Sequence, residues 1–196
     1  MRIIAATQNK HKLEEIYAIV KKFGMDLVPM AEAGFDIEID ENGTTCEENS
    51  LIKAKAITEL SGEMAIADDT GLFVDFLGGE PGVKSARYAG EHGDDAANRK
   101  KLLDKLEGLP FEKRTAMFVT VISLVYPDGK TLVARGECHG HIAEKEIGDR
   151  GFGYDSIFIP KESDKTFAQL SLEFKNSISH RARALEKLQA MLEEQK

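Results

Sequence analysis

The hydrophobic positions at the start of the chain switch from a continuous run to a helical repeat and back. Residues 2–6 form a short apolar run that predicts a first strand. Apolar residues then recur at helical spacing over 13–20, which predicts a helix with Asn9 as its N-cap and Gly24 as its stop. A second apolar run over 25–29 predicts another strand. The start of the chain therefore predicts two strands on either side of one helix.

Apolar stripes at helical spacing predict three further helices. They cover about 48–60, 94–106 and 179–192. The acidic segment 31–46 has no such repeat, and its Asp, Asn and Gly residues are typical of turns. We therefore expect that segment to be irregular.

The remaining apolar runs predict strands. The runs 64–67 and 72–77 are expected to be two strands separated by a tight acidic turn, and the glycine-rich stretch 78–82 to be a loop. The long β-rich run 116–126 and its return over 131–137 predict a hairpin. Mixed strands with interspersed helices predict an α/β fold with a mixed β-sheet.

Length, charge and cysteine content narrow the class of protein. The 196 residues suit a single domain over 1–196. The net charge of −8 argues against a generic nucleic-acid binder, and no apolar run approaches the ~20 residues that cross a bilayer. Two cysteines, Cys46 and Cys138, give no disulfide framework, and the first residues do not form a signal peptide. We therefore expect a cytoplasmic protein that binds neither nucleic acid nor a membrane.

Two adjacent carboxylates, Asp68 and Asp69, are the most suggestive polar feature of the chain. Neighbouring carboxylates repel each other unless a cation or a hydrogen-bond donor offsets the repulsion. Carboxylate oxygens suit Mg²⁺, and Asp40 and Glu41 are candidates to complete the ligand set. In such a site one aspartate can also accept a proton from an attacking water. The alternative is a polar exit from a strand into a turn.

The segment between the first strand and the first helix could bind phosphate. Backbone N–H groups at a helix N-terminus favour anions. Its side chains add hydrogen-bond donors, and the candidate residues are Thr7, Gln8, Asn9, Lys10, His11 and Lys12. The segment lacks a Walker pattern. The alternative is a capped surface helix with solvated lysines.

Asn49 and Lys53 lie four residues apart on the second predicted helix, and therefore share a face. That face could point at a triphosphate or be an ordinary solvated surface. Residues 138–141, Cys-His-Gly-His, alternate as a strand does, and we do not interpret them as a zinc site.

Two segments near the C-terminal end could recognise a base. Gly151 and Gly153 flank Phe152, and an exposed Phe can stack on a base, although a Phe packed into the core is the alternative. His180 and Arg181 open the last predicted helix, and both can donate to a carbonyl oxygen of a base. The alternative there is a charged first turn of a surface helix.

Together these segments resemble the inosine triphosphate pyrophosphatase family, whose members remove deaminated purine nucleotides. The matching pieces are Thr7-x-Asn9-x-x-Lys12, Glu48-Asn49 with Lys53-Ala54, Ala67-Asp68-Asp69-Thr70-Gly71-Leu72, Gly78-Gly79-x-Pro81-Gly82 with Ser85-Ala86-Arg87-Tyr88, Gly151-Phe152-Gly153-Tyr154-Asp155, and Ser179-His180-Arg181. They keep the order of the family and spread over nearly the whole chain. Thr70 stands where many bacterial members carry Ser, and the hydroxyl is retained.

The resemblance implies an elongated mixed β-sheet with flanking helices, and two lobes around a central substrate cleft. It also implies a Mg²⁺-dependent homodimer that hydrolyses ITP, dITP and XTP to the monophosphate and pyrophosphate. The alternatives are a Maf-like pyrophosphatase for other modified nucleotides and a nucleotide-binding module without turnover. The paired carboxylates favour an enzyme over a module of that kind.

The resemblance also implies roles for single residues. Residues 7–12 and Lys53 would hold the phosphates, and Thr70 would contact the substrate. Asp69 would bind Mg²⁺ and serve as the proton acceptor, with Asp68 and either Asp40 or Glu41 in the metal shell. The residues implied for the base pocket are Phe152, Gly153, Tyr154, Asp155, Lys175, His180 and Arg181.

Overall fold

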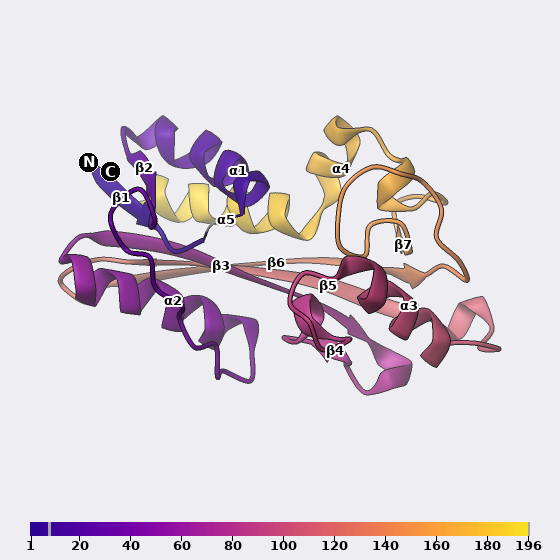
Figure 1. Cartoon of the computed structure of the whole chain (residues 1–196). Coiled ribbons are helices and arrows are strands. Elements are labelled where there is room, and N and C mark those ends of the chain that lie inside the picture. The colour runs from indigo at the N-terminus through magenta and orange to yellow at the C-terminus, as the bar shows by residue number, and fades with distance from the viewer. Residues whose placement is uncertain (8, 196) are drawn as a thin grey trace. The chain divides into compact units, whose positions relative to one another are not determined.

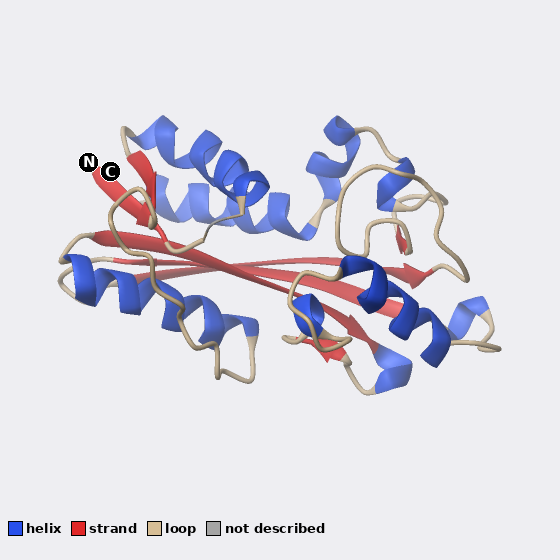
Figure 2. Ribbon diagram, viewed as in Figure 1, coloured by secondary structure: helices blue, strands red, loops and turns tan. Residues whose placement is uncertain are grey.

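The computed structural model of the chain describes residues 1–7 and 9–195, and of His11 the backbone alone. In this described part the chain forms five α-helices and one seven-stranded sheet (Figure 2). The strands are β1 Arg2–Ala5, β2 Asp26–Pro29, β3 Met64–Val74, β4 Pro81–Gly82, β5 Thr115–Val125, β6 Thr131–Ile142 and β7 Phe158–Pro160. The helices are α1 Lys10–Val20, α2 Cys46–Ser61, α3 Asp95–Lys105, α4 Leu172–Ile178 and α5 His180–Glu193.

The sheet is mixed. Its strand order is β2-β1-β3-β5-β6-β7, with β4 paired to β3 outside this path. Strand β1 runs parallel to both β2 and β3, with Ile3 opposite Leu27 on one side and Met64 on the other. Strand β4 is antiparallel to β3, and β7 is antiparallel to β6. The predicted α/β class with a mixed sheet is therefore confirmed.

The chain divides into two compact units. Unit 1 comprises Met1–Asp69, Thr120–Gly136 and Arg183–Lys196, and unit 2 comprises Thr70–Val119 and Glu137–Ala182. The points of division fall inside β3, β5, β6 and α5. Each unit has its own hydrophobic core.

Unit 1 buries both faces of its strands. Neighbouring residues on a strand point to opposite faces, so Ile3 and Ile4 enter different clusters. Ile3 packs with residues of α1 and α5, and Ile4 packs with residues of α2. Figure 1 shows α1 and α5 on one side of these strands and α2 on the other. Burial on both faces explains why β1 is a continuous apolar run instead of an alternating one.

The core of unit 2 contains a group of aromatic rings. Phe118 meets Phe158 edge to face with ring centroids 4.7 Å apart, and the rings of Phe158 and Phe167 lie 5.1 Å apart. Leu72 of β3 and Leu102 of α3 belong to the same cluster. This core supports the loops of unit 2 that carry several predicted site residues.

The predicted turn at Asp68 and Asp69 is wrong. Strand β3 runs without interruption from Met64 to Val74, so both carboxylates lie in the middle of a strand. Gly71 also lies within this strand and not in a turn. A Cβ there would lie 2.7 Å from the carbonyl oxygen of Gly82. The glycine instead allows β4 to approach β3 closely. The stretch predicted as a loop over 78–82 accordingly ends in this short strand.

Most other predicted elements are confirmed, with shifted ends. Helix α2 begins two residues early because Thr45 and Glu48 form a capping box. The expected hairpin is present as neighbouring strands β5 and β6, and β6 extends to include residues 138–141 as strand. The short helix α4 was not predicted, since its residues lack an apolar stripe long enough to register.

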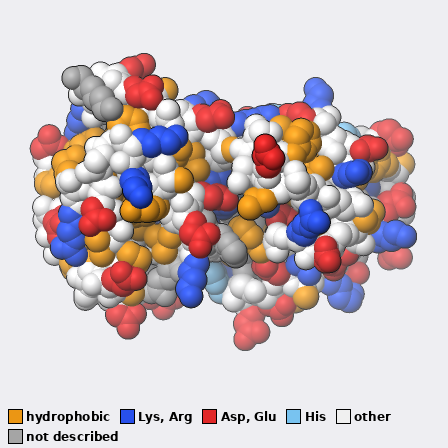
Figure 3. All heavy atoms as spheres, turned by 90° about the horizontal axis from the view of Figure 1, so that it is seen from above, with side chains coloured by type: hydrophobic (Ala, Val, Ile, Leu, Met, Phe, Trp, Pro, Cys, Tyr) orange, Lys and Arg blue, Asp and Glu red, His pale blue; other side chains and the backbone are white. Residues whose placement is uncertain are grey.

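Charged side chains of both signs lie on the face of the molecule drawn in Figure 3. On the face seen in Figure 3, acidic and basic side chains are interspersed, and neither sign forms a continuous patch among the described residues. None of the described helices is both long and apolar enough to cross a membrane.

Candidate functional site

The two carboxylates of β3 point to opposite faces of the sheet in unit 1. Asp68 shares its side with Ile66, which packs in the cluster of α1 and α5, and Asp69 shares its side with Ala67, which packs toward α2. Strand alternation therefore assigns one carboxylate to each layer of helices. Each of them meets a lysine from its own layer.

Asp68 pairs with Lys12 of α1. The Nζ of Lys12 lies 2.8 Å from the Oδ2 of Asp68, whose side chain is fully buried. Lys12 stands in the first turn of α1, where the side chain of Asn9 accepts a hydrogen bond from the Lys12 backbone N–H. The predicted N-cap is thus confirmed, and it fixes the turn that carries the lysine.

Asp69 pairs with Lys53 of α2. The Nζ of Lys53 lies 3.6 Å from the Oδ1 of Asp69 and 3.2 Å from the Oε2 of Glu41. The Nδ2 of Asn49, one helical turn before Lys53, lies 3.5 Å from the Oδ2 of Asp69. We refer to Lys12, Glu41, Lys53, Asp68 and Asp69 as the acid–lysine cluster.

Burial shapes the electrostatics of this cluster. Burial raises the pKa of the Asp69 carboxyl, and the nearby Lys53 ammonium only partly offsets that effect. For Lys53, burial lowers the pKa, but the negative charges of Asp69, Asp68 and Glu41 outweigh it, so the net pKa is raised. The lysine therefore stays charged, while the aspartate takes up a proton more readily than an exposed one would.

Cys46 is a member of this site that sequence reasoning missed. Its thiol forms a side-chain hydrogen bond with Asp69, and the residue is buried at the first position of α2. Burial, followed by the charge of Asp69, raises the pKa of this thiol. The thiol is therefore a neutral donor to the carboxylate. The sequence carries no local signal for this contact.

The donor chemistry of the cluster fits Mg²⁺. Glu41 and Asp69 both reach the same ammonium, so two hard oxygen ligands already converge on one positive charge. Mg²⁺ needs only one or two protein carboxylates, because waters and substrate phosphates complete its shell. Across the described residues, no group of three or more His, Cys, Asp or Glu side chains is placed to hold a metal. Asp40, the other candidate, is exposed.

The predicted phosphate segment leads into α1. The backbone N–H of Asn9 lies 3.3 Å from the Oγ1 of Thr7, and Lys10, which is exposed, begins the helix. Gln8 lies outside the described residues, as does the side chain of His11. The described part of this segment is therefore a helix N-terminus whose lysine at position 12 already faces a carboxylate.

In unit 2 a glycine-flanked loop presents Phe152. A Cβ at Gly151 would collide with the Oδ2 of Asp155, so no other residue fits there without movement. That same oxygen accepts from the Phe152 backbone N–H at 3.0 Å and from the Nζ of Lys175 at 2.6 Å. The Phe152 side chain remains exposed, with 39% of its surface accessible. The ring is therefore held at the surface and not in the core.

Cations surround this ring. The Nζ of Lys175 lies 5.6 Å from the ring centroid of Phe152, and the Cζ of Arg181 lies 5.8 Å from it. His180 is buried and stacks on Phe118, with centroids 4.5 Å apart and planes 12° apart. We refer to Phe152, Asp155, Lys175, His180 and Arg181 as the aromatic–cation cluster.

Other predicted residues have structural contacts. The hydroxyl of Tyr154 donates to the backbone oxygen of Ser85 at 2.8 Å, which ties the loop to the segment after β4. Thr70 is half-buried directly after Asp69 in β3. Gly153 has both of its backbone polar groups held by side chains of α3.

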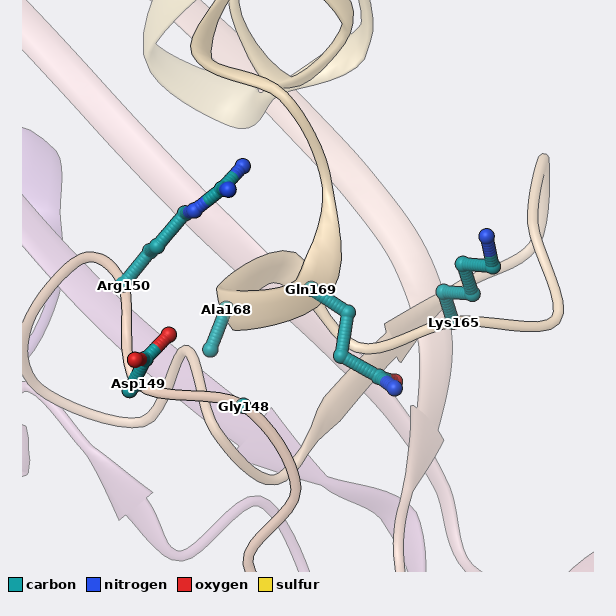
Figure 4. Close-up of a pocket in the computed structure, with 6 residues that line it drawn as sticks. All are labelled: Gly148, Asp149, Arg150, Lys165, Ala168 and Gln169. Carbon is teal, nitrogen blue, oxygen red and sulfur yellow. The ribbon is translucent and has the colours of Figure 1, made fainter.

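A hollow of about 280 Å³ lies close by in unit 2, and it does not contain the predicted residues. It is lined by Gly148, Asp149, Arg150, Lys165, Ala168 and Gln169. In Figure 4 the side chains of Arg150 and Lys165 stand on opposite sides of the hollow and do not point toward one another. The hollow therefore lacks the convergent cations that a phosphate site would need.

The sequence matches a known family over almost its full length. A model of the Ham1 family matches residues 3–191. The chain belongs to the Ham1 family. The resemblance drawn from the sequence motifs is thereby confirmed. The matched residues include every member of both clusters.

Named relatives of this Ham1 chain are close. It is 49% identical to the dITP/XTP pyrophosphatase of Bacillus subtilis (strain 168), over 97% of this chain and 96% of that protein. It is 47% identical to the dITP/XTP pyrophosphatase of Bacillus licheniformis, over 98% of each. These relatives are hydrolases by name.

Solved structures share the fold of this chain. The Ham1 protein of Staphylococcus aureus superposes with a TM-score of 0.93 at 43% identity, covering all of both chains. The nucleoside-triphosphatase, or dITP/XTP pyrophosphatase, of Mycobacterium abscessus gives a TM-score of 0.83 at 44% identity, over 96% of this chain and 98% of that one.

Proposed function

We propose that this Ham1 chain is a Mg²⁺-dependent pyrophosphohydrolase that converts ITP, dITP and XTP to the monophosphate and pyrophosphate. The activity would clear deaminated purines from the nucleotide pool. The observation that carries the proposal is Asp69, a buried carboxylate with a raised pKa, beside Lys53 and a second carboxylate. Curated relatives named dITP/XTP pyrophosphatase support the same substrate class.

In this proposal the acid–lysine cluster acts on the triphosphate. Lys12 and Lys53 form ion pairs with carboxylates, and phosphate oxygens would compete for the same ammonium groups. Asp69 would then lie beside the phosphates, where a carboxylate can act as a general base. It would accept the proton of the water that attacks the α-phosphorus. The bond from that phosphorus to the bridging oxygen breaks, and pyrophosphate leaves.

Charge on the leaving group must be neutralised. Glu41 and Asp69 are the residues that would hold Mg²⁺, and the bound ion would offset negative charge on the phosphates. Lys12 and the N-terminus of α1 would add positive charge near the phosphates. Asp68, which already faces Lys12, would orient that lysine.

The aromatic–cation cluster would recognise the base. The exposed ring of Phe152 offers a stacking surface. Hypoxanthine and xanthine carry a carbonyl at C6, which accepts hydrogen bonds from donors such as His180 and Arg181. Adenine carries an amino group there, so a donor would meet a donor. Mismatched buried donors lower affinity strongly.

We further propose that the whole chain, 1–196, acts as one catalytic domain and as a homodimer in the cytoplasm. Its substrate is a small nucleotide, and no nucleic acid or membrane takes part. The support is the resemblance to the family, together with a net charge of −8 that disfavours large polyanions.

One assay tests the proposed reaction. Purified protein is incubated with Mg²⁺ and ITP, and the products are separated and quantified. We expect equal amounts of IMP and pyrophosphate, loss of turnover after chelation, and slow turnover of ATP. Orthophosphate with IDP would contradict cleavage at the α-phosphorus. Preference for modified pyrimidine nucleotides would favour a Maf-like enzyme, and binding without products would favour a binding module.

A further inference from the structure

Two side chains of helix α3 in unit 2 hydrogen-bond the loop that carries Phe152. The Oδ2 of Asp95 accepts a hydrogen bond from the backbone N–H of Gly153 at 2.7 Å. The Nη1 of Arg99 donates to the backbone oxygen of the same Gly153 at 2.8 Å. Asp95 and Arg99 lie one helical turn apart on the same face of α3. Two charged side chains therefore hold both polar groups of a single loop residue.

Arg99 and Asp95 are themselves held in place. The Nε of Arg99 donates to the Oε2 of Glu146 at 2.8 Å, and Glu146 also accepts from the hydroxyl of Ser156 at 3.1 Å. Asp95 is the first residue of α3, where a negative charge is favoured by the helix dipole. Both side chains are thus stabilised where they stand, and they can act as rigid supports.

Gly153 needs such support. Its φ of +60° lies in the left-handed region, and a glycine there has many alternative conformations to lose. On the N-terminal side of Phe152, its own backbone N–H donates to Asp155. The direction of the exposed Phe152 ring depends on the backbone on both of its sides.

We propose that Asp95 and Arg99 are positioning residues for base recognition, because they fix the Gly153 backbone and thereby the direction in which Phe152 presents its ring. The inference rests on the proposed function of Phe152 as a stacking surface. Neither residue touches the substrate in this proposal. Their loss would let the loop sample other conformations, and substrate affinity would fall in proportion to the fraction of binding-competent loops.

The test uses Asp95→Ala and Arg99→Gln, with Asp95→Asn as the conservative variant that keeps an acceptor oxygen. Lys100→Ala is the matched control, because Lys100 is the next residue of α3 and pairs with Asp104, away from the loop. We expect KM for ITP to rise about tenfold in the first two variants, with kcat within about threefold. Asp95→Asn should fall in between, and Lys100→Ala should match the parent.

A second readout does not depend on turnover. The chain contains no tryptophan, so Phe152→Trp places a single fluorophore in the loop. Quenching of its emission by IMP reports contact with the base. In this background, Asp95→Ala should shift the emission maximum and raise the IMP concentration at half-quenching by about the same tenfold. Melting curves of every variant verify that it is folded at the assay temperature.

The outcomes separate the two proposals. If Phe152→Ala raises KM but Asp95→Ala, Asp95→Asn and Arg99→Gln change neither KM nor the tryptophan signal, the positioning role is wrong. If Phe152→Ala leaves KM unchanged, stacking by Phe152 is wrong, and the inference that depends on it is overturned as well. A similar loss of kcat in Asp95→Ala and Arg99→Gln, with no change in KM, would mark Asp95 and Arg99 as structural residues.

Discussion

The acid–lysine cluster of unit 1 and the aromatic–cation cluster of unit 2 use their ion pairs differently. In the first, buried charges hold each other, as Lys12 holds Asp68 and Lys53 holds Asp69. In the second, Asp155 pairs with Lys175 and also holds the backbone N–H of Phe152, and the Phe152 ring is left exposed. A cluster suited to catalysis needs charges whose electrostatic interactions are strengthened by burial. A cluster suited to recognition needs an accessible surface at a fixed angle.

The difference also sets how each cluster tolerates mutation. Removing one partner of a buried ion pair leaves an uncompensated charge, which costs about 3–5 kcal/mol. Isosteric changes are therefore the informative ones in the acid–lysine cluster. An exposed ring supports little of the fold, so truncation of Phe152 in the aromatic–cation cluster should alter binding more than stability. Substitutions in the two clusters test this contrast.

Asp69→Asn should have the largest effect. The amide keeps the shape of the side chain but cannot accept the proton and is a poorer ligand for a cation. We expect kcat for ITP to fall by at least ~10²–10⁴-fold. Pyrophosphate release measures the loss, and a melting curve shows whether the fold survives. Asp36→Asn, which changes an exposed acid in the irregular segment, serves as the control. A folded Asp69→Asn variant with normal turnover would remove Asp69 from the mechanism.

Arg181→Ala should collapse the selectivity for ITP over ATP. Arg181 is buried beside the Phe152 ring, and its loss would remove the donor that we propose for the C6 carbonyl. A site built on such hydrogen bonds can discriminate by ~10⁴-fold or more. We therefore expect kcat/KM for ITP to fall far more than kcat/KM for ATP. An equal loss on both substrates would show that Arg181 binds phosphate or supports the fold.

Local patterns in the sequence were enough to predict most of the fold. The apolar spacing of α1 and its Asn9 cap, the hairpin of β5 and β6, and the start of α5 near Ser179 were all predicted. These features depend on residues close in sequence, so their signals are local. The motif resemblance then supplied the family, because it combines segments that no single periodicity connects.

The failures come from contacts between distant parts of the chain. Asp is disfavoured in strands, so Asp68 and Asp69 were predicted in a turn. Their lysine partners on α1 and α2 make the strand tolerable, and nothing next to the aspartates reveals those partners. The choice between Asp40 and Glu41 was left open because both lie in a segment without periodicity, and the structure brings Glu41 to Lys53.

Phe152→Ala should produce an intermediate effect that separates binding from stability. Stacking of a base on an aromatic ring is worth ~1–3 kcal/mol, so KM should rise accordingly. The melting temperature should change little, because the ring is exposed. Phe158→Ala is the contrasting variant, since that ring is fully buried in the core of unit 2 and its loss should cost about 3–5 kcal/mol of stability. A large drop in melting temperature for Phe152→Ala, with unchanged KM, would make it a core residue.

The smallest expected effect concerns Cys46, whose thiol hydrogen-bonds the carboxylate of Asp69. A single hydrogen bond contributes about 1 kcal/mol, so Cys46→Ala should lower kcat about fivefold while KM stays the same. Cys46→Ser retains a donor and should keep most of the activity. Cys138→Ala removes an equally buried thiol from unit 2 and controls for loss of packing. If Cys46→Ser and Cys46→Ala lose the same activity, the thiol fills space and does not orient Asp69. If only Cys46→Ala loses activity, the orientation of the Asp69 carboxylate depends on a neutral hydrogen-bond donor as well as on its lysine.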